Sequence, residues 1–217
     1  MREINLLKNY PKTKRNLEKR SLKTKEQQEI ARKFDKDFFD GSRDTGYGGF
    51  NYNQKYWDLV VRDFIEFYDL NNNSSILDVG CGKGFMLYDF KRHLPDSNLK
   101  GVDISSYAIE NSLPEIKNSL EVGDCKKLSY KNNEFDLVIS INTIHNHELK
   151  ECAESITEID RVSKKNSFII VDAYNTDEEK EKLFAWNLTA KTILHTNEWK
   201  DLFKKNNYKG DYFWFCP

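Results

Sequence analysis

The sequence predicts an α/β three-layer sandwich, in which a mostly parallel sheet of six to seven strands lies between two layers of helices. Two observations lead to this fold class. Short apolar runs alternate with amphipathic stretches from residue 74 onwards, a spacing that is typical of strands joined by crossover helices. The first apolar run ends in a glycine-rich turn, "DVGCGKGF", at the position where an open parallel sheet binds its ligands. Residues 1–56 predict a helical and loop extension, and residues 57–217 predict the α/β domain.

The composition indicates a globular domain with a sizeable core. The chain has 217 residues, of which 38% are hydrophobic and 32% are charged, and its net charge of −1 argues against a protein that binds polyanions over its whole surface. The four cysteines show no C-x-x-C spacing, which argues against a zinc knuckle or a disulfide framework and favours a reducing, cytoplasmic location. No apolar run approaches the length of a membrane span and the N-terminus lacks a signal-peptide core, so we expect no membrane partner.

The chain before the sheet predicts two helices joined by a glycine-rich loop. Residues 21–39 carry apolar side chains at a four-residue step, which predicts an amphipathic helix, and residues 54–69 repeat that step. Between them, "DGSRDTGYGGFNYN" (residues 40–53) predicts a loop whose glycines permit a hinge and whose aromatic side chains can exclude water. We expect this loop either to close over a ligand site as a lid or to be a surface loop that ties the two helices together.

After residue 74, strands and helices alternate. The run "EFDLVISIN" is almost continuously apolar, as expected for a strand that is covered on both faces. Thr176 followed by Glu179 predicts a capped helix start. The predicted strands are residues 75–80, 98–104, 120–124, 134–142, 166–175 and 208–215. The predicted helices run up to residue 90, over residues 106–112, 148–163 and 197–206, and from Thr176 onwards.

The glycine turn restricts which ligand the sheet can bind. Gly80, Gly82 and Gly84 would let a ligand approach backbone amides at the positive end of the next helix. Their spacing, G-x-G-x-G, differs from the G-x-G-x-x-G fingerprint of dinucleotide-binding proteins. Lys83 is followed by glycine rather than by serine or threonine, so a phosphate-binding P-loop is excluded.

Acidic residues follow the next two predicted strands. Asp103 in "GVDIS" lies 19 residues after Gly84, where a carboxylate can accept hydrogen bonds from both ribose hydroxyls. Asp124 in "VGDC" can bind an exocyclic amine of adenine, or it is a solvated loop acid. Together, the turn and the two strand-end carboxylates predict a site for a nucleoside, and this site does not require the ligand to carry a pyrophosphate.

Four motifs in this order, "ILDVGCGKG", "GVDIS", "VGDC" and "FDLVISINTIHN", resemble those of the class I S-adenosylmethionine-dependent methyltransferases over roughly residues 74–175. The resemblance implies a Rossmann-like fold whose seventh and last strand is antiparallel. Because "YFWF" is followed so soon by Pro217, we expect the usual terminal hairpin to be shortened and the seventh strand to be in doubt. The resemblance also implies S-adenosyl-L-methionine as cofactor and S-adenosyl-L-homocysteine as product.

The resemblance further implies roles for individual residues. Asp78 and Cys81 belong to the same turn, where we expect Cys81 to be a small packing residue rather than a nucleophile. Gly80 and Gly82 would line the methionine and ribose part of the cofactor, and Asp103 would bind the ribose hydroxyls. Ile104 would lie against the adenine face, and Asp124 and Cys125 would contact the adenine edge. Ile141 and Asn142 would close the site towards the substrate.

Three residues are candidates for catalysis. His145 follows the fourth strand and has an ordinary pKa of about 6.5, which suits a general base, although it could instead cap a helix or pack under the lid. Asp172 is the nearby carboxylate that could take the same proton. Tyr47, between two glycines, could reach the site on the lid and attract a sulfonium cation. We favour structural roles for His147 and His195, and because no His, Cys and Asp group shows metal-ligand spacing we expect no metal.

The sequence therefore predicts a methyltransferase that acts by in-line displacement on an oxygen or nitrogen, or on a carboxylate, of a small polar metabolite or carbohydrate-type precursor. The donor is already activated, so alignment of the reacting atoms can supply about 7–11 kcal/mol of the barrier. "NTIHN" stands where amide- and nucleobase-amine methylators carry N-P-P-[YF], which argues against those substrates. The alternatives are a nicotinamide-dependent oxidoreductase, or a non-catalytic cofactor-binding or interaction protein of the same fold.

The N-terminal leader is basic. Residues 1–26 contain nine lysines and arginines against three glutamates, a net charge of +6. This leader could be a solvated helical arm, could bind a phosphate or carboxylate on the substrate, or could touch nucleic acid, and the neutral overall balance disfavours the last. We expect a small-molecule partner and a monomer or homodimer.

Overall fold

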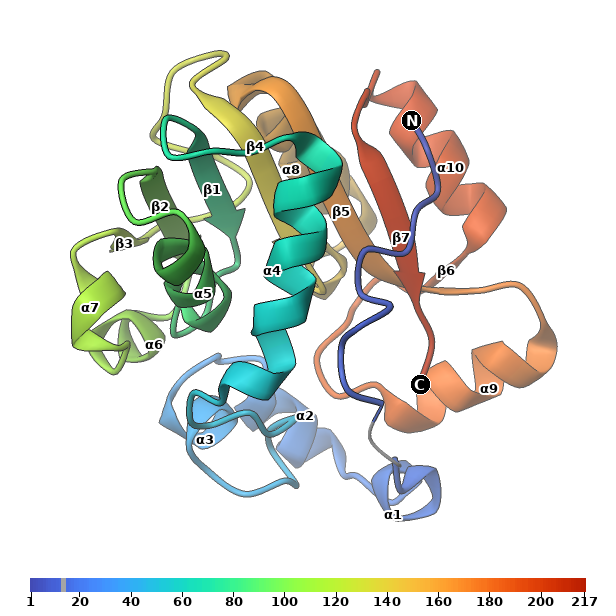
Figure 1. Ribbon diagram of the computed structural model, residues 1–217. Coiled ribbons are helices and arrows are strands. Elements are labelled where there is room, and N and C mark those ends of the chain that lie inside the picture. Colours follow the sequence, from blue (N-terminus) through green and yellow to red (C-terminus); the bar gives the residue numbers. More distant parts are fainter. Residues whose placement is uncertain (13–14) are drawn as a thin grey trace.

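The computed structural model describes residues 1–12 and 15–217, and it contains a sheet with helices on both faces (Figure 1). Thr13 and Lys14 of the predicted basic leader lie outside the described residues. The strands are β1 (Ser75–Val79), β2 (Asn98–Asp103), β3 (Leu120–Val122), β4 (Phe135–Ile141), β5 (Ser163–Tyr174), β6 (Leu194–His195) and β7 (Asp211–Phe215). The helices are α1 (Leu17–Ser21), α2 (Lys25–Ala31), α3 (Lys36–Phe39), α4 (Gln54–Tyr68), α5 (Phe85–His93), α6 (Ser106–Glu110), α7 (Pro114–Lys117), α8 (Leu149–Val162), α9 (Asp177–Trp186) and α10 (Thr196–Lys205), with a 3-10 turn at Ile144–Asn146.

The sheet has seven strands in the order β3-β2-β1-β4-β5-β6, and β7 pairs with β5. Every pair of these strands is parallel, which confirms the predicted mostly parallel sheet. The antiparallel last strand that the family resemblance implied is wrong for this chain. Residues 211–215 run parallel to residues 168–172 of β5, because α10 carries the chain back across the sheet before β7 begins.

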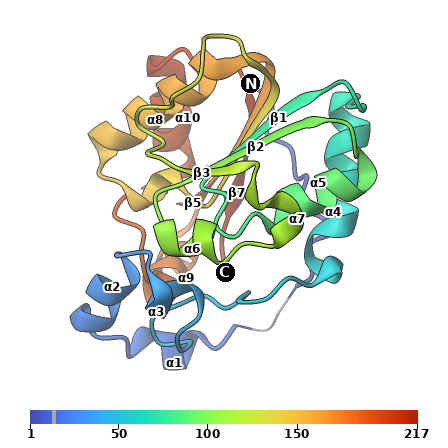
Figure 2. The ribbon, with the colours of Figure 1, turned by 90° about the vertical axis from the view of Figure 1, so that its left-hand side faces the viewer.

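The two faces of the sheet bury separate halves of the core. Side chains alternate along a strand, so Ile76, Leu137 and Phe168 pack with α4 and α5, and the residue after each of them packs with α8 and α10. Figure 2 shows α8 and α10 on one side of the sheet and α4 and α5 on the other. The central strands are therefore apolar on both faces, and the polar groups that matter for function are concentrated at the strand ends.

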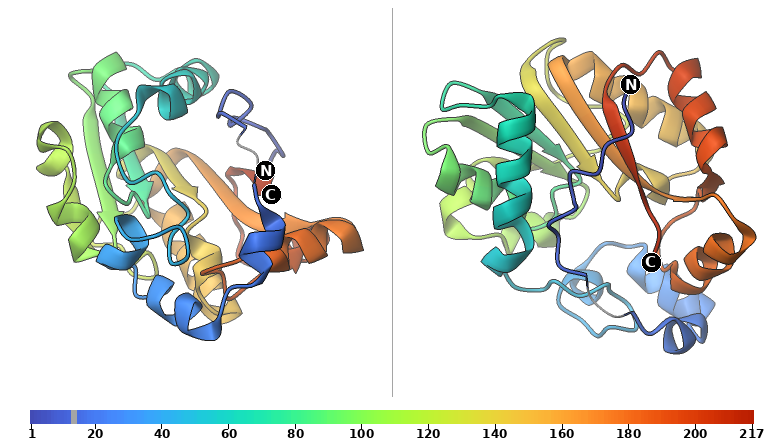
Figure 3. Two further views of the ribbon diagram at one scale, coloured as in Figure 1. Left: turned by 90° about the horizontal axis from the view of Figure 1, so that it is seen from below. Right: turned by 45° about the vertical axis from the view of Figure 1, so that its right-hand side comes forward.

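The N-terminal extension divides into two parts with different tasks. The first part follows the edge of β7, where Glu3 bridges to Tyr212 and Leu6 is buried in the core (Figure 3). The second part, α1 to α3 and the loop after them, lies across the carboxyl ends of the strands (Figure 1). The single helix predicted for residues 21–39 is wrong. Phe34 has a left-handed φ of 51° and Asp35 caps α3 by accepting from the Lys36 amide, so the chain breaks between α2 and α3.

No helix in the described part of the chain is both long enough and apolar enough to cross a membrane.

The buried carboxylate of Asp211 joins the N-terminus to the sheet. It accepts hydrogen bonds from the Arg2 backbone and guanidinium at 2.8–3.1 Å and from the Tyr68 hydroxyl at 3.2 Å. We expect Asp211→Ala to lower the free energy of unfolding by about 2–3 kcal/mol, because it leaves these donors without their charged acceptor. Urea denaturation measures this loss, with the exposed Asp201→Ala on α10 as control. A loss no larger than that of the control would contradict the assignment.

Candidate functional site

The glycine turn between β1 and α5 is held against β2 by backbone hydrogen bonds. The amides of Gly80 and Cys81 both donate to the Val102 carbonyl, at 2.7 and 3.1 Å, and Gly80 has a φ of 83°. A side-chain carbon at Gly80 would collide with Thr143, which follows β4. Glycine is therefore required here by backbone conformation and by close packing.

The sequence suggested that the amides of this turn are available to a ligand. Two of them instead form hydrogen bonds within the protein. Gly82 donates to Asp103 Oδ2 at 2.8 Å, and Gly84 donates to the Cys81 carbonyl at 2.9 Å. These amides are used to shape the turn. The three glycines pack against protein side chains, Gly80 against Thr143, Gly82 against Phe39 and Gly84 against Leu120, so a ligand would meet the partly exposed backbone of residues 80–82.

Two acidic side chains are buried at the ends of neighbouring strands. Asp103 Oδ2 accepts from Gly82 and its Oδ1 accepts from the Ser105 amide at 2.9 Å, yet burial still raises its pKa. Burial and the charge of Asp103 together raise the pKa of Asp78 to about 7. A cation bound beside this pair would favour both ionised forms, so the pair is suited to a positively charged ligand. Ile104, the next residue, is 56% exposed and presents an apolar face beside Asp103.

The end of β4 lies directly beside the turn. Asn142 has a left-handed φ of 54°, and its amide donates to the Ile170 carbonyl at 2.9 Å. Its side-chain Oδ1 is buried and has no hydrogen-bond partner among the described residues. Buried acceptors without a partner are rare in proteins, so this atom is one that a bound polar group would satisfy. Ile141, just before it, is partly buried.

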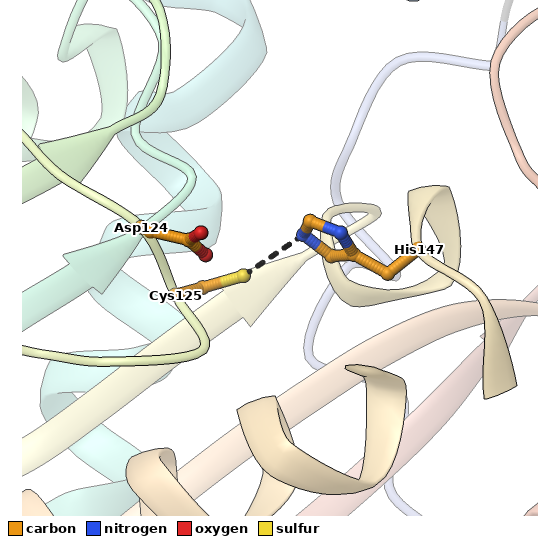
Figure 4. Close-up of side chains that lie close together, drawn as sticks. All are labelled: Asp124, Cys125 and His147. Atoms are coloured by element: carbon orange, nitrogen blue, oxygen red, sulfur yellow. Dashed lines mark hydrogen bonds between the residues drawn. The ribbon is translucent and has the colours of Figure 1, made fainter. Parts of the chain in front are cut away.

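A cluster of three side chains lies next to Asp103 along the strand ends (Figure 4). Cys125 Sγ is 3.2 Å from His147 Nε2, and the donor atoms of Asp124, Cys125 and His147 all lie within 4.8 Å of one another. Burial raises the pKa of Cys125 to about 11 and lowers the pKa of His147. Sequence spacing could not reveal this cluster, because His147 comes 22 residues after Cys125.

These three side chains supply fewer ligands than the four of a structural zinc site and as many as the three protein ligands of a catalytic zinc site. One feature favours another use. The Lys126 ammonium lies 3.5 Å from Asp124 and 2.7 Å from Glu151, so a positive charge already neutralises the acids here. The adenine-edge roles of Asp124 and Cys125 therefore stay as predictions.

His145 is a buried core residue that links β4 to β5. The side chain is 4% exposed, and its Nδ1 accepts a hydrogen bond from the Asp172 amide at 2.9 Å. Burial lowers the pKa of His145 to about 3, so the ring is neutral and carries its proton on Nε2. The only lone pair of the ring is therefore occupied. This geometry does not favour His145 as the general base, and it assigns the ring a positioning role under Asp172.

The carboxylate of Asp172 is the better candidate for accepting a proton. Burial raises its pKa to about 7, although the charge of Arg15 opposes that shift. Its Oδ1 lies 3.7 Å from His145 Nδ1, and the adjoining backbone is held by Trp199, which donates to the Asp172 carbonyl at 3.0 Å. The carboxylate is thus placed at the end of β5 by bonds that leave it free to titrate near neutral pH.

Tyr47 connects the loop of residues 40–53 to the loop that follows α9. Its hydroxyl accepts from the Leu188 amide at 2.6 Å and from the Thr189 amide at 3.3 Å. Its ring packs between those of Phe38 and Trp186, at 6.1 and 5.6 Å. The Tyr47 hydroxyl therefore joins the loop of residues 40–53 to the loop after α9, and the role of this loop as a lid stays a prediction.

Comparison with known proteins places this arrangement among methyltransferases. A family model described as a methyltransferase domain matches residues 70–210. The malonyl-[acyl-carrier protein] O-methyltransferase of Legionella pneumophila is 28% identical over 58% of this chain and 45% of its own length. The EEF1A lysine methyltransferase 2 of Danio rerio is 33% identical over 56% of each chain. The phosphoethanolamine N-methyltransferase 3 of Arabidopsis thaliana is 34% identical over 39% of this chain and 18% of its own.

The solved structures agree on the fold. The YcgJ protein from Bacillus subtilis superimposes with a TM-score of 0.55 at 17% identity, over 67% of this chain and 66% of that one. The chain spans between 18% and 56% of the lengths of the three curated relatives named above. Their names include oxygen and nitrogen acceptors, and both small molecules and proteins.

The buried Asp78 makes stability depend on pH. Its pKa is raised from 3.8 to about 7, so the folded protein binds more protons than the unfolded chain in that window, and stability falls as pH rises through it. We expect Asp78→Asn to reduce this loss and to raise the free energy of unfolding at pH 8 by about 1–3 kcal/mol. Urea denaturation at several pH values measures the effect. The exposed Asp96→Asn serves as control, and an unchanged pH slope in Asp78→Asn would contradict the assignment.

The Tyr47 hydroxyl protects two backbone amides. We expect Tyr47→Phe to speed hydrogen exchange at Leu188 and Thr189 about tenfold, because these amides lose their acceptor while the ring contacts remain. Exchange measured by NMR resolves the two amides. Tyr56→Phe is the matched control, since the Tyr56 hydroxyl has no hydrogen-bond partner in residues 1–12 and 15–217. Equal exchange in both variants would show that Tyr47 does not hold the lid.

Proposed function

The chain belongs to the class I S-adenosylmethionine-dependent methyltransferases, and from this premise we propose that it methylates an oxygen or nitrogen of a small polar metabolite or carbohydrate-type precursor. The observation that carries the proposal is the glycine turn, which is fixed to Asp103 and packs against Thr143, the residue after Asn142, whose buried Oδ1 has no hydrogen-bond partner among the described residues. The turn is held in shape by Asp103, two buried acids favour a cation, and the loop of residues 40–53 would cover the strand ends as a lid.

The residues of the turn fit the cofactor on observations of this structure. Gly80 lets the turn pack directly against Thr143 at the end of β4, and the buried Asn142 Oδ1 beside Thr143 has no hydrogen-bond partner among the described residues. When bound, S-adenosylmethionine supplies an activated methyl group on a positively charged sulfur. The residues that would hold it are Asp78, Gly80, Cys81 and Gly82 around the methionine part, Asp103 at the ribose, Ile104, Asp124 and Cys125 around the adenine, and Ile141 and Asn142 near the sulfur.

The loop of residues 40–53, the proposed lid, is held to the rest of the protein at two places. On one side, Lys83 of the glycine turn donates to Asp40 Oδ1 at 2.6 Å and to the Phe50 carbonyl at 3.0 Å. Tyr107 of α6 donates to Asp40 Oδ2 at 2.8 Å. On the other side, Tyr47 binds the loop after α9. These two sets of hydrogen bonds hold the loop over the site. A loop held in this way excludes water and fixes the orientation of the acceptor, which is most of what an in-line displacement requires.

The remaining chemical requirement is the removal of a proton from the acceptor. Asp172, with a pKa near 7, can take a proton from an alcohol or an ammonium group, and His145 positions it. A carboxylate acceptor arrives deprotonated and needs no base. Tyr47 then acts by holding the lid, since its hydroxyl already accepts two hydrogen bonds.

The enclosed position of the site favours a small acceptor over a protein chain. A protein substrate would have to reach Asp172 past the helices α1 to α3 and the Tyr47 contact (Figure 1). This closed arrangement supports the small-molecule reading, although one of the relatives is named for a protein acceptor.

Cofactor binding tests the proposal directly. At about a hundredfold excess over its Kd, S-adenosylhomocysteine should stabilise the fold by about 2.7 kcal/mol and raise the melting temperature by about 5–10 °C. NAD at the same concentration should give no shift, because the turn lacks the dinucleotide spacing.

Gly80→Ala is the matched variant for this test. It should fold but bind S-adenosylhomocysteine at least about tenfold more weakly, because the new methyl group collides with Thr143 and deforms the turn. Circular dichroism checks the fold. A wild-type protein that responds to NAD, or to neither compound, would overturn the proposed function.

A further inference from the structure

Three arginines from the N-terminal extension gather at the lid. Arg15 precedes α1, Arg20 lies within α1 and Arg43 lies in the loop after α3. The guanidinium carbons of Arg15 and Arg20 lie 5.4 and 5.0 Å from the centre of the same ring, that of Trp186. The Arg43 guanidinium lies against Gly48, the residue after Tyr47, and its charge, after burial, contributes to lowering the pKa of Arg15 and of Arg20.

None of these arginines has an acidic partner within 4.0 Å in the part of the chain that the structure describes. This is unlike the arginines elsewhere that sit in ion pairs. Those pairs are Arg2 with Asp211, Arg92 with Asp58 and Asp89, and Arg161 with Glu158. The charges of Asp44 and Asp172 act on Arg20 and Arg15 only from beyond ion-pair distance, so these guanidinium groups keep the capacity to bind a further anionic group.

Arg20 provides the second, independent observation. Its side chain is buried, with 7% of the residue exposed, and its Nη2 donates to the Gly46 carbonyl at 3.0 Å. Its Nη1 is buried and has no hydrogen-bond partner among the described residues. A buried charged donor without a partner costs free energy, and an anionic ligand group would satisfy it.

Aromatic rings orient the guanidinium groups. Arg15 lies over Phe215 at 4.8 Å as well as over Trp186, and Arg20 lies over Tyr47 at 5.4 Å. A guanidinium that stacks on a ring face keeps its N–H edge available for hydrogen bonds in its own plane.

The arginines belong to the same site as the proposed chemistry. The charge of Arg15 lowers the pKa of Asp172 at the end of β5, so the two groups interact electrostatically. Arg20 stacks on Tyr47, whose hydroxyl joins the proposed lid to the loop after α9. Figure 3 shows α1 beside α9 at this end of the molecule.

We propose that the methyl acceptor carries an anionic group, a phosphate or a carboxylate, and that Arg15, Arg20 and Arg43 bind it while the acceptor atom lies near Asp172. This inference rests on the proposed function and names its substrate class. Guanidinium groups bind phosphate and carboxylate oxygens in pairs, so three of them give both affinity and orientation.

The experiment is calorimetric titration of the full chain with inorganic phosphate and, separately, with citrate, each in the absence and presence of saturating S-adenosylhomocysteine. We expect at least one anion to bind at millimolar concentration. Arg15→Gln and Arg20→Gln should each weaken that binding by about tenfold or more, since each removes a charge-assisted pair of hydrogen bonds. Arg62→Gln, an exposed arginine on α4, is the matched control and should bind as the wild type does.

The same variants separate this inference from the proposed function. The inference predicts that Arg15→Gln and Arg20→Gln keep the wild-type affinity for S-adenosylhomocysteine. It is overturned if neither anion binds, if the variants bind the anion unchanged, or if they lose the cofactor product instead, which would assign the arginines to the cofactor. A wild-type protein that binds the anion but not S-adenosylhomocysteine would overturn the proposed function alone. If Arg20→Gln does not fold, the partly exposed Arg15→Gln carries the test.

Discussion

The contact on which the rest of the site depends is the carboxylate of Asp103 across the ends of β1 and β2. One oxygen holds the Gly82 amide and the other holds the Ser105 amide, so a single side chain joins the glycine turn to the start of α6. The Val102 carbonyl fixes the same turn through Gly80 and Cys81. The glycine turn is therefore already shaped in the ligand-free fold by bonds within the protein.

The buried charged groups proposed to bind ligands lower the stability of the ligand-free fold. Asp78, Asp103 and Asp172 are buried at three strand ends, and burial raises the pKa of each, so their ionised forms destabilise the empty fold. The unpaired arginines of the lid impose a similar cost with the opposite sign. Under the proposed function, Asp78 and Asp103 lie beside the cationic donor, and the arginines lie beside an anionic group of the acceptor. Each ligand would relieve the strain of its own half of the site.

Local pattern was enough to predict most of the fold and the glycine turn, while the ligand-binding roles of the residues in that turn stay predictions. Apolar alternation predicted the strands, and glycine spacing with Asp103 predicted the turn, because these features depend on near neighbours in sequence. Patterns could not show that Phe34 would break a helix, that β7 would run parallel to β5, or that Tyr47 would be held by Leu188. The Arg15–Trp186 stack and the Cys125–His147 contact likewise join distant segments, which only packing brings together.

A crystal structure of the protein with S-adenosylhomocysteine tests the central claim most directly. The account predicts that the adenosyl group lies along residues 80–84, that both ribose hydroxyls donate to Asp103, and that the sulfur faces Asn142. Asp103 should keep its bonds to Gly82 and Ser105 in that complex, because the turn is already formed without ligand. A ligand bound away from this turn, or a turn that must release Asp103 to admit it, would contradict the account.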